Sequence, residues 1–202
     1  MYCRICGIGG SGKTTIAKAI YNQIHGTFLK KGFIEDISEV SRTRKQANLQ
    51  ERLLSDLLKT KVEIHRVEMG RSMIGERLYG KKVLIVLDDV NEYGPLDLWE
   101  SSSWFGEGTV IIITTRDESL LRIHHVDSIF RMNLMNPNES LELLSWHAFR
   151  EAKPKEEYHF LAKRVVAYCG GLPLVLEVIG SCLYERTKEE WNRLLLQLDN
   201  SP

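Results

Sequence analysis

The sequence carries no excess charge of either sign and no long hydrophobic run. Its 202 residues include 27 lysines and arginines and 27 aspartates and glutamates, so the formal net charge is 0. Because no basic field is available, neither a nucleic acid nor a membrane is an expected partner. The longest apolar run, Val83–Leu87, is far too short to cross a bilayer. With 43% hydrophobic and 27% charged residues, we expect a soluble globular protein of one or two domains.

Cysteine is also scarce, and the N-terminus has no signal-like pattern. Four cysteines without an export signal predict reduced thiols and a cytoplasmic location, with the nucleus as the alternative. Cys3 and Cys6 form a C-x-x-C pair, which raises the question of a metal or redox site. On one strand, an offset of three places the two side chains on opposite faces. We therefore interpret them as packing residues.

A glycine-rich stretch at residues 7–15 fits the phosphate-loop pattern G-x-x-x-x-G-K-[ST]. Glycines allow backbone conformations in which successive N–H groups turn inward around a phosphate. We expect the Lys13 ammonium to reach the β- and γ-phosphates, where it would also act in catalysis, and the Thr14 hydroxyl to coordinate Mg²⁺. The residues predicted to bind phosphate are Gly7, Gly9, Gly10, Ser11, Gly12, Lys13, Thr14 and Thr15.

The alternative to a phosphate site is a glycine-rich turn that merely precedes a helix. The sequence context favours the phosphate site. Residues 4–8 read as a short buried strand, and Ile16, Ala17, Ala19, Ile20 and Ile24 predict a helix with one apolar face. Strand, loop and helix in this order are the expected surroundings of a phosphate loop.

A second motif joins a buried strand to two carboxylates. Residues 81–87 lack alternation, as in a central parallel strand, and lead into Asp88 and Asp89. Open α/β sheets bind ligands at the carboxyl ends of their strands, so Asp88 is expected to hold Mg²⁺. Asp89 is predicted to orient or deprotonate an attacking water, and its alternative role is to cap the following turn.

The third motif is an arginine after another buried strand. Residues 109–113 predict that strand, which ends in Thr114-Thr115-Arg116. The planar guanidinium of Arg116 could face a γ-phosphate, where it would sense or stabilise charge. An arginine after a strand is more often a surface residue. The sensor role is favoured only because the phosphate loop and the acid strand are present in the same chain. Further strands are expected at residues 32–37 and 128–134, a polar loop at 38–46, and helices at 49–58 and 69–79.

The pattern turns helical from Asn136 to the end. Asn136 as N-cap, Pro137 at the first position and Glu139 predict a capping box. Thr187 and Glu190 predict another. Gly170-Gly171 should stop the second helix, and Pro173 should open the third. The apolar residues that suggest the four helices are Leu141, Leu144, Trp146 and Phe149 in the first, Phe160, Leu161, Val165 and Val166 in the second, Leu174, Leu176, Val178, Ile179 and Leu183 in the third, and Trp191, Leu194, Leu195 and Leu198 in the fourth.

The phosphate loop, the acid strand, Thr114-Thr115-Arg116 and Gly171-Leu172-Pro173-Leu174 follow one another along the chain. Together they resemble the nucleotide-binding (NB-ARC) domain of plant disease-resistance proteins, which are signal-transduction P-loop ATPases. Three details are similar to the branch that carries a TIR domain: Phe33-Ile34-Glu35-Asp36-Ile37, Asn91 after Leu87-Asp88-Asp89-Val90, and residues 143–149.

The resemblance covers nearly the whole chain and implies its fold. A three-layer α/β/α P-loop NTPase domain with a parallel sheet is expected over residues 1–134, followed by a small all-helical (ARC1-like) lid over residues 135–202. It also implies ATP, ADP and Mg²⁺ as ligands, and places Pro173 against the base or ribose. The residue-level alternative for Pro173 is a simple helix initiator.

Some parts of the family's pattern have no counterpart in this chain. The segment that helps to hold adenine, the winged-helix region, the TIR domain and the leucine-rich repeats are missing, so the chain reads as a nucleotide-binding core with its first helical lid. Those domains are the expected partners, with oligomerisation in the ATP-bound form. Ser11 stands where the family usually has isoleucine, and we expect its side chain to face solvent.

Four functions were considered for a chain with these motifs. The first is an ADP/ATP switch in plant defence, reset by slow hydrolysis, with weak ATPase activity at most. The second is a P-loop NTPase or kinase with turnover on a small substrate, and the apolar helices after Asn136 argue against its arginine-rich lid. A GTPase would need N-K-x-D, but no asparagine here precedes lysine. An interaction module without nucleotide binding is disfavoured by Lys13, Thr14 and Asp88.

Overall fold

A computed structural model describes residues 1–37, 45–91, 104–122 and 128–200. The chain forms two compact units. The first comprises Met1–Ile8 and Lys13–Met132, and the second comprises Gly9–Gly12 and Asn133–Pro202. Each unit has its own hydrophobic core and is described by itself.

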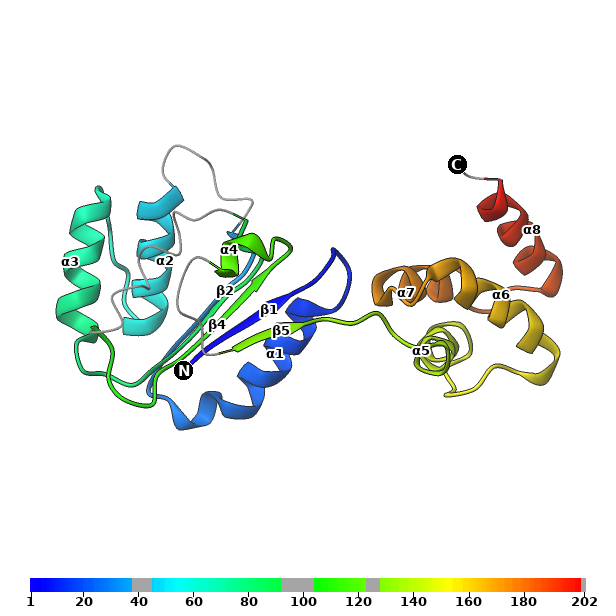
Figure 1. Cartoon of the computed structure of the whole chain (residues 1–202), viewed down its shortest axis with the longest axis horizontal. Helices are drawn as coiled ribbons and strands as arrows, with labels where there is room; N and C mark the ends of the chain where they lie inside the picture. Colours follow the sequence, from blue (N-terminus) through cyan, green and yellow to red (C-terminus); the bar gives the residue numbers. More distant parts are fainter. Residues whose placement is uncertain (38–44, 92–103, 123–127, 201–202) are drawn as a thin grey trace. The chain divides into compact units, whose positions relative to one another are not determined.

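The first unit contains a parallel five-stranded sheet. In chain order, its elements are β1 (Tyr2–Cys6), α1 (Lys13–Ile24), η1 (His25–Thr27), β2 (Lys30–Ile34), α2 (Lys45–Leu58), α3 (Val67–Leu78), β3 (Val83–Leu87), β4 (Val110–Thr115), α4 (Ser119–Arg122) and β5 (Ser128–Arg131). The strand order is β2-β3-β4-β1-β5, and every pairing is parallel. The strand that comes first in the chain therefore lies inside the sheet, between β4 and β5 (Figure 1).

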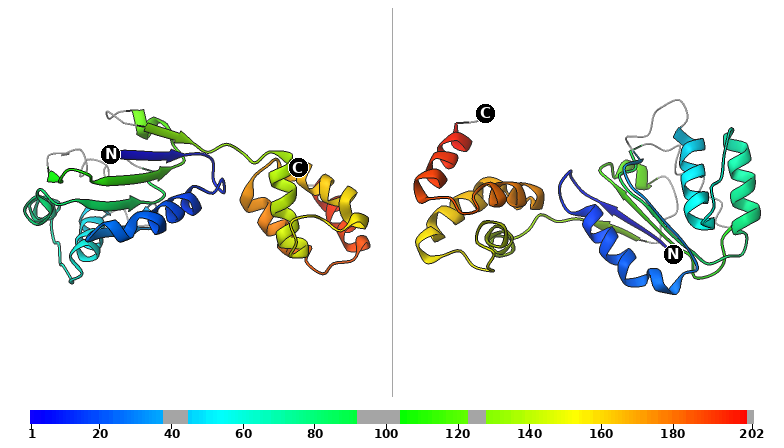
Figure 2. Two further views of the ribbon diagram at one scale, coloured as in Figure 1. Left: turned by 90° about the horizontal axis from the view of Figure 1, so that it is seen from below. Right: turned by 180° about the vertical axis from the view of Figure 1, so that it is seen from behind.

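Helices cover both faces of this sheet, which explains the apolar run of β3. Alternate residues of a strand point to opposite faces. Val83, Ile85 and Leu87 belong to the core shared with α2 and α3, whereas Leu84 and Val86 belong to the core shared with α1. Figures 1 and 2 show α1 on one side of the sheet and α2 and α3 on the other. The expected three-layer α/β/α architecture is confirmed.

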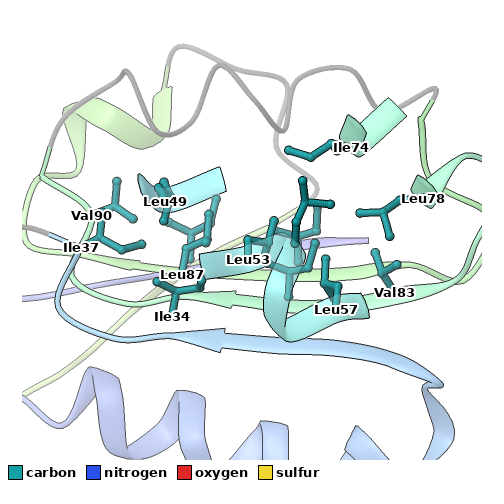
Figure 3. Packing of buried hydrophobic residues seen from close by; sticks show 14 of the residues in the cluster. Ile34, Ile37, Leu49, Leu53, Leu57, Ile74, Leu78, Val83, Leu87 and Val90 are labelled. Carbon is teal, nitrogen blue, oxygen red and sulfur yellow. The ribbon is translucent and has the colours of Figure 1, made fainter. Parts of the chain in front are cut away.

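The larger core lies under α2. Leu49, Leu53 and Leu57 are at most 1% exposed and belong to one cluster with Ile34, Val83 and Leu87 of the strands, in which Leu57 lies beside Val83 (Figure 3). Full burial of one such side chain stabilises the fold by about 1.5–3 kcal/mol. The spacing of these leucines predicted this helix correctly.

The second unit is built from four helices: α5 (Pro137–Phe149), α6 (His159–Cys169), α7 (Pro173–Cys182) and α8 (Lys188–Asp199), with the short η5 (Glu156–Tyr158) before α6. Both predicted capping boxes are confirmed. The Asn136 side chain accepts hydrogen bonds from the N–H groups of Asn138 and Glu139, and its own N–H donates to the Glu139 carboxylate. Thr187 and Glu190 form the same reciprocal pair. Helix α6 ends at Gly170 in the left-handed conformation, as the glycine pair predicted.

Several expectations were wrong in detail. Ala19 was expected on the apolar face of the helix that follows the phosphate loop, but it is exposed. Trp146, Phe160, Leu174 and Val178 lie on the predicted helices and are 49–73% exposed. The core of the second unit instead forms around residues such as Leu144, Leu176 and Trp191. The first strand begins at Tyr2 and ends at Cys6, so Gly7 and Ile8 lie beyond it, and β2 ends at Ile34. Most of the expected polar loop at residues 38–46 lies outside the described residues, and its last two residues are already helical.

Cys3 and Cys6 both lie on β1 and are unbonded thiols. Burial raises the pKa of each thiol, and the nearby Glu118 carboxylate raises that of Cys6 further. These surroundings keep both sulfurs protonated and agree with a packing role.

Candidate functional site

The carboxyl ends of three neighbouring strands gather the candidate residues of the first unit. Strands β3, β4 and β1 are adjacent and parallel, so Asp88 after β3, Thr115 at the end of β4 and Gly7 after β1 lie at one edge of the sheet. The N–H of Gly7 donates to the Thr115 carbonyl oxygen at 3.3 Å. Such an edge is where open α/β sheets bind ligands.

Two glycines of the loop adopt backbone angles that favour glycine. Gly10 has φ of 77° and Gly12 has φ of 90°, both in the region that a Cβ disfavours. Gly7 and Gly9 have φ outside that region. The backbone angles therefore require glycine at the second pair of positions and not at the first.

Lys13 starts α1 and is almost fully buried, with 7% of its surface exposed. Its Nζ atom donates to the carbonyl oxygens of Gly7 and Ile8, each at 2.9 Å. Burial lowers the pKa of its ammonium, and the positive charge of Arg116 lowers it further, whereas Asp89 and Asp88 oppose the shift. The lysine thus stands within the electrostatic reach of both carboxylates and of the arginine.

Asp88 is 2% exposed and accepts hydrogen bonds from two threonine hydroxyls. Thr14 Oγ1 donates to Oδ1 and Oδ2, at 3.0 Å each, and Thr114 Oγ1 donates to Oδ1 at 2.6 Å. The short second bond is typical of a hydroxyl that donates to an ionised carboxylate. The threonine of the loop and the first carboxylate after β3 are therefore in direct contact.

Asp89 and Arg116 form an ion pair. Arg116 Nε donates to Asp89 Oδ1 at 3.1 Å, and Nη2 approaches Oδ2 at 3.5 Å. The arginine side chain is 66% exposed and the aspartate 22%. Asp89 also has φ of 57°, in the left-handed region that a non-glycine residue enters with strain. Non-glycine residues in such conformations concentrate at functional sites.

The remaining candidates are Thr15, Pro173 and Ser11. Thr15 is exposed on α1, and Pro173 is the first residue of α7, in the second unit. Ser11 is 1% exposed, and its Oγ atom has no hydrogen-bond partner among the described residues, so the expectation of a solvent-facing side chain was wrong. Within the second unit, the N–H of Leu174 donates to the Gly10 carbonyl oxygen at 3.2 Å.

The donor set around Asp88 fits Mg²⁺. A carboxylate and a hydroxyl are hard oxygen ligands, and Mg²⁺ is usually held by one or two carboxylates together with substrate phosphates and water. Within the described ranges, no three His, Cys, Asp or Glu side chains lie close enough to share a metal ion. Thr14 and Asp88 therefore suit a metal that arrives with a nucleotide.

Sequence reasoning missed Thr114. It identified the triplet Thr114-Thr115-Arg116 but assigned a role to the arginine alone. The available signal was that Thr114 carries a hydroxyl group and stands at the end of a buried strand. That strand was expected to lie in the same parallel sheet as the strand that leads into Asp88. The contact of Thr114 with Asp88 could not be predicted without the pairing of β3 with β4, which places Leu87 opposite Ile113.

Comparison with known proteins decides the family. A profile described as the NB-ARC domain matches residues 2–154. The chain belongs to the NB-ARC family. Among curated relatives, the NB-ARC chain is 43% identical over 199 residues to the disease resistance protein RUN1 of Vitis rotundifolia and 39% identical over 209 residues to the TMV resistance protein N of Nicotiana glutinosa. These alignments cover 97% and 98% of this chain but only 15% and 18% of the two relatives.

Solved structures agree on the fold. The Drosophila ORC structure bound to DNA matches 98% of this NB-ARC chain and 60% of the matched chain, with a TM-score of 0.65 and 14% sequence identity. The module is accordingly a nucleotide-binding domain of the P-loop class. Among its described helices, none has the length and apolar character needed to cross a membrane.

Proposed function

We propose that this chain is the ADP/ATP switch module of a plant immune receptor, reset by slow Mg²⁺-dependent hydrolysis of ATP. The proposal joins the NB-ARC family membership to the printed names of the relatives, which are disease-resistance proteins. The observation that carries the nucleotide part is the contact of Thr14 with Asp88 beside the buried Lys13.

Lys13, Thr14 and Asp88 would bind the phosphates and the metal ion. The Lys13 ammonium would bind the β- and γ-phosphates, because it is positively charged and held next to the loop. Thr14 and Asp88 would hold Mg²⁺, which supplies charge neutralisation on the phosphates. The backbone N–H groups of the loop and the Ser11 and Thr15 region would complete the phosphate cradle.

Arg116 and Asp89 would form the nucleotide-sensing pair. Arg116 would contact the γ-phosphate, which only ATP carries, and so supply the differential affinity that a switch needs. Asp89 would orient or deprotonate the attacking water, in exchange for its present bond to the arginine. The left-handed backbone of Asp89 supports a functional role for this residue.

Residues 1–134 would then serve as the nucleotide-binding domain and residues 135–202 as the helical lid. Pro173 at the start of α7 would pack against the base or ribose. Because the chain spans 15% and 18% of its relatives, TIR, winged-helix and leucine-rich regions of a parent receptor are proposed partners, as is self-association in the ATP-bound form.

The alternative, an NTPase or kinase that turns over a small substrate, has less support. The relatives found are disease-resistance proteins, not metabolic kinases. Identification of the nucleotide that copurifies with the protein separates the two: tightly held ADP supports the switch, and a site that is empty and exchanges freely supports turnover.

Substitution of Lys13 tests the nucleotide assignment. Lys13→Arg should weaken ADP and ATP binding more than tenfold, because a longer planar guanidinium cannot replace a compact ammonium among the loop carbonyls. Isothermal titration with each nucleotide measures the change. Lys18→Arg is the matched control, since Lys18 lies on the same helix but is half-exposed and paired with Glu35. Affinity of Lys13→Arg within about threefold of wild type, a difference of only about 0.7 kcal/mol, would contradict the assignment.

A further inference from the structure

One buried threonine forms hydrogen bonds with three residues of the turn that follows β3. Thr114 is 1% exposed at the end of β4. Its Oγ1 atom donates to Asp88 Oδ1 at 2.6 Å and accepts the N–H of Asp89 at 2.9 Å. Its carbonyl oxygen accepts the N–H of Val90, also at 2.9 Å. Three consecutive residues are therefore bound to one.

The chemistry of a hydroxyl explains why threonine suits this position. A hydroxyl has one donor and two acceptor sites, so it can give its proton to a carboxylate and accept an amide proton at the same time. Neither valine, which has the same shape, nor alanine can do either. The methyl group of Thr114 fits the buried strand, while its hydroxyl makes both contacts.

Each contact fixes a different property of the acid motif. The bond to Asp88 selects the rotamer in which its carboxylate also meets Thr14. The bond from the Asp89 N–H stabilises the left-handed backbone at that residue. That backbone in turn directs the Asp89 side chain to Arg116.

We infer that Thr114 is a positioning residue for both carboxylates, and that the Mg²⁺-dependent part of nucleotide affinity depends on its hydroxyl. The inference rests on the proposed function for its nucleotide part. It assigns Thr114 no contact with the nucleotide. The competing explanation is that Thr114 only adds stability to the end of a buried strand.

Thr109 offers a matched control for that explanation. It is also a buried threonine, 8% exposed, and lies just before β4 at the opposite end of the strand. Its hydroxyl donates to the Gly106 carbonyl oxygen at 2.8 Å and accepts the N–H of Val83 at 3.3 Å. Thr109→Val therefore removes a comparable pair of bonds far from the carboxylates.

The first experiment titrates ATP into the whole chain with Mg²⁺ and, separately, with EDTA. The Mg²⁺ gain is the ratio of ATP affinity with Mg²⁺ to ATP affinity in EDTA. For Thr114→Val we expect this gain to fall about tenfold relative to wild type, because a hydrogen bond to a charged group is lost. Its ATP affinity in EDTA should stay within about threefold of wild type. Thr114→Ser should keep the gain, since the hydroxyl remains. Thr109→Val should lose stability and keep the gain. If Thr114→Val does not fold, Thr114→Ala removes the same hydroxyl and takes its place.

The second experiment follows hydrogen exchange of the Asp89 amide by NMR and requires no nucleotide. Thr114→Val should accelerate that exchange at least tenfold relative to wild type, and Thr114→Ser should not. The inference is overturned if Thr114→Ser or Thr109→Val loses as much of the Mg²⁺ gain as Thr114→Val does. It is also overturned if Thr114→Val leaves the exchange rate of the Asp89 amide unchanged. If wild type itself binds no nucleotide, the proposed function fails, and amide exchange still decides whether Thr114 holds the turn.

Discussion

Removal of the Arg116 side chain gives the sharpest test of the switch. If this arginine contacts the γ-phosphate, Arg116→Ala should weaken ATP binding and leave ADP binding unchanged. A charge-assisted contact of this kind contributes about 1.5–3 kcal/mol, which corresponds to about one to two decades in affinity. We therefore expect the dissociation constant for ATP to rise by about 10- to 100-fold and that for ADP to stay within about threefold.

The structure also limits how much of a loss in ATP affinity could come from loss of the Arg116–Asp89 ion pair. Arg116 pairs with Asp89, but its side chain is 66% exposed and one of the two contacts is long, at 3.5 Å. Exposed ion pairs of this kind contribute about 0–1 kcal/mol. Arg116→Ala should thus lower the free energy of unfolding by less than about 1 kcal/mol, too little to explain a tenfold loss of ATP affinity through the fold.

Isothermal titration with ATP and ADP measures the affinities, and urea unfolding measures the stability. Arg186→Ala is the control, because Arg186 is also an exposed arginine in an ion pair, 56% exposed, and lies in the second unit. Parallel losses for ATP and ADP would refute the sensor role and show that Arg116 acts through Asp89. No change in either affinity would show that Arg116 is a surface residue.

Three further predictions follow from the packing and the acid motif. Asp89→Asn should slow ATP hydrolysis at least tenfold with Mg²⁺-ATP affinity nearly unchanged, because only the proton acceptor is lost. If Asp89→Asn and Asp88→Asn instead reduce binding and hydrolysis equally, both residues are simple metal ligands. Gln50 is fully buried, and its amide has no hydrogen-bond partner among the described residues, so Gln50→Met should raise the free energy of unfolding by about 1–3 kcal/mol in urea titrations. A Cβ at Gly180 of α7 would lie 2.7 Å from the Cβ of His147, so Gly180→Ala should destabilise by about 1–2 kcal/mol. Gly75→Ala in α3 has only ordinary contacts, at 3.8 Å or more, and should stabilise by up to about 1 kcal/mol; the same sign for both would contradict the packing argument.

Features that depend on neighbours in the sequence were predictable. The capping boxes at Asn136 and Thr187 require only residues three apart, and both are present. The leucine spacing of α2 and the apolar run of β3 likewise identified a helix and a buried strand. The phosphate-loop pattern and the place of Asp88 after a buried strand could be recognised in the sequence, because both depend on local spacing.

Features that depend on which surfaces meet were not predictable. Apolar residues such as Trp146 and Phe160 indicated helices but not which side chains are buried, because burial depends on the neighbouring helices, and both of these side chains are exposed. The pair of Asp89 with Arg116 joins residues 27 positions apart, and the two bonds of Thr114 exist because β4 lies beside β3. Ser11 was expected in solvent because the sequence around it says nothing about what covers the loop.

The position of β1 inside the sheet has a consequence for synthesis on the ribosome. Tyr2 pairs with Ile111, so β1 has no neighbouring strand until about 110 further residues have been translated. At roughly 5–20 residues per second, this takes about 5–20 s. During that interval β2 and β3 can pair with each other, whereas the strand that leads into the phosphate loop remains an unpaired nascent segment. A chain released before Val110 would leave β3 with one neighbouring strand and β1 with none.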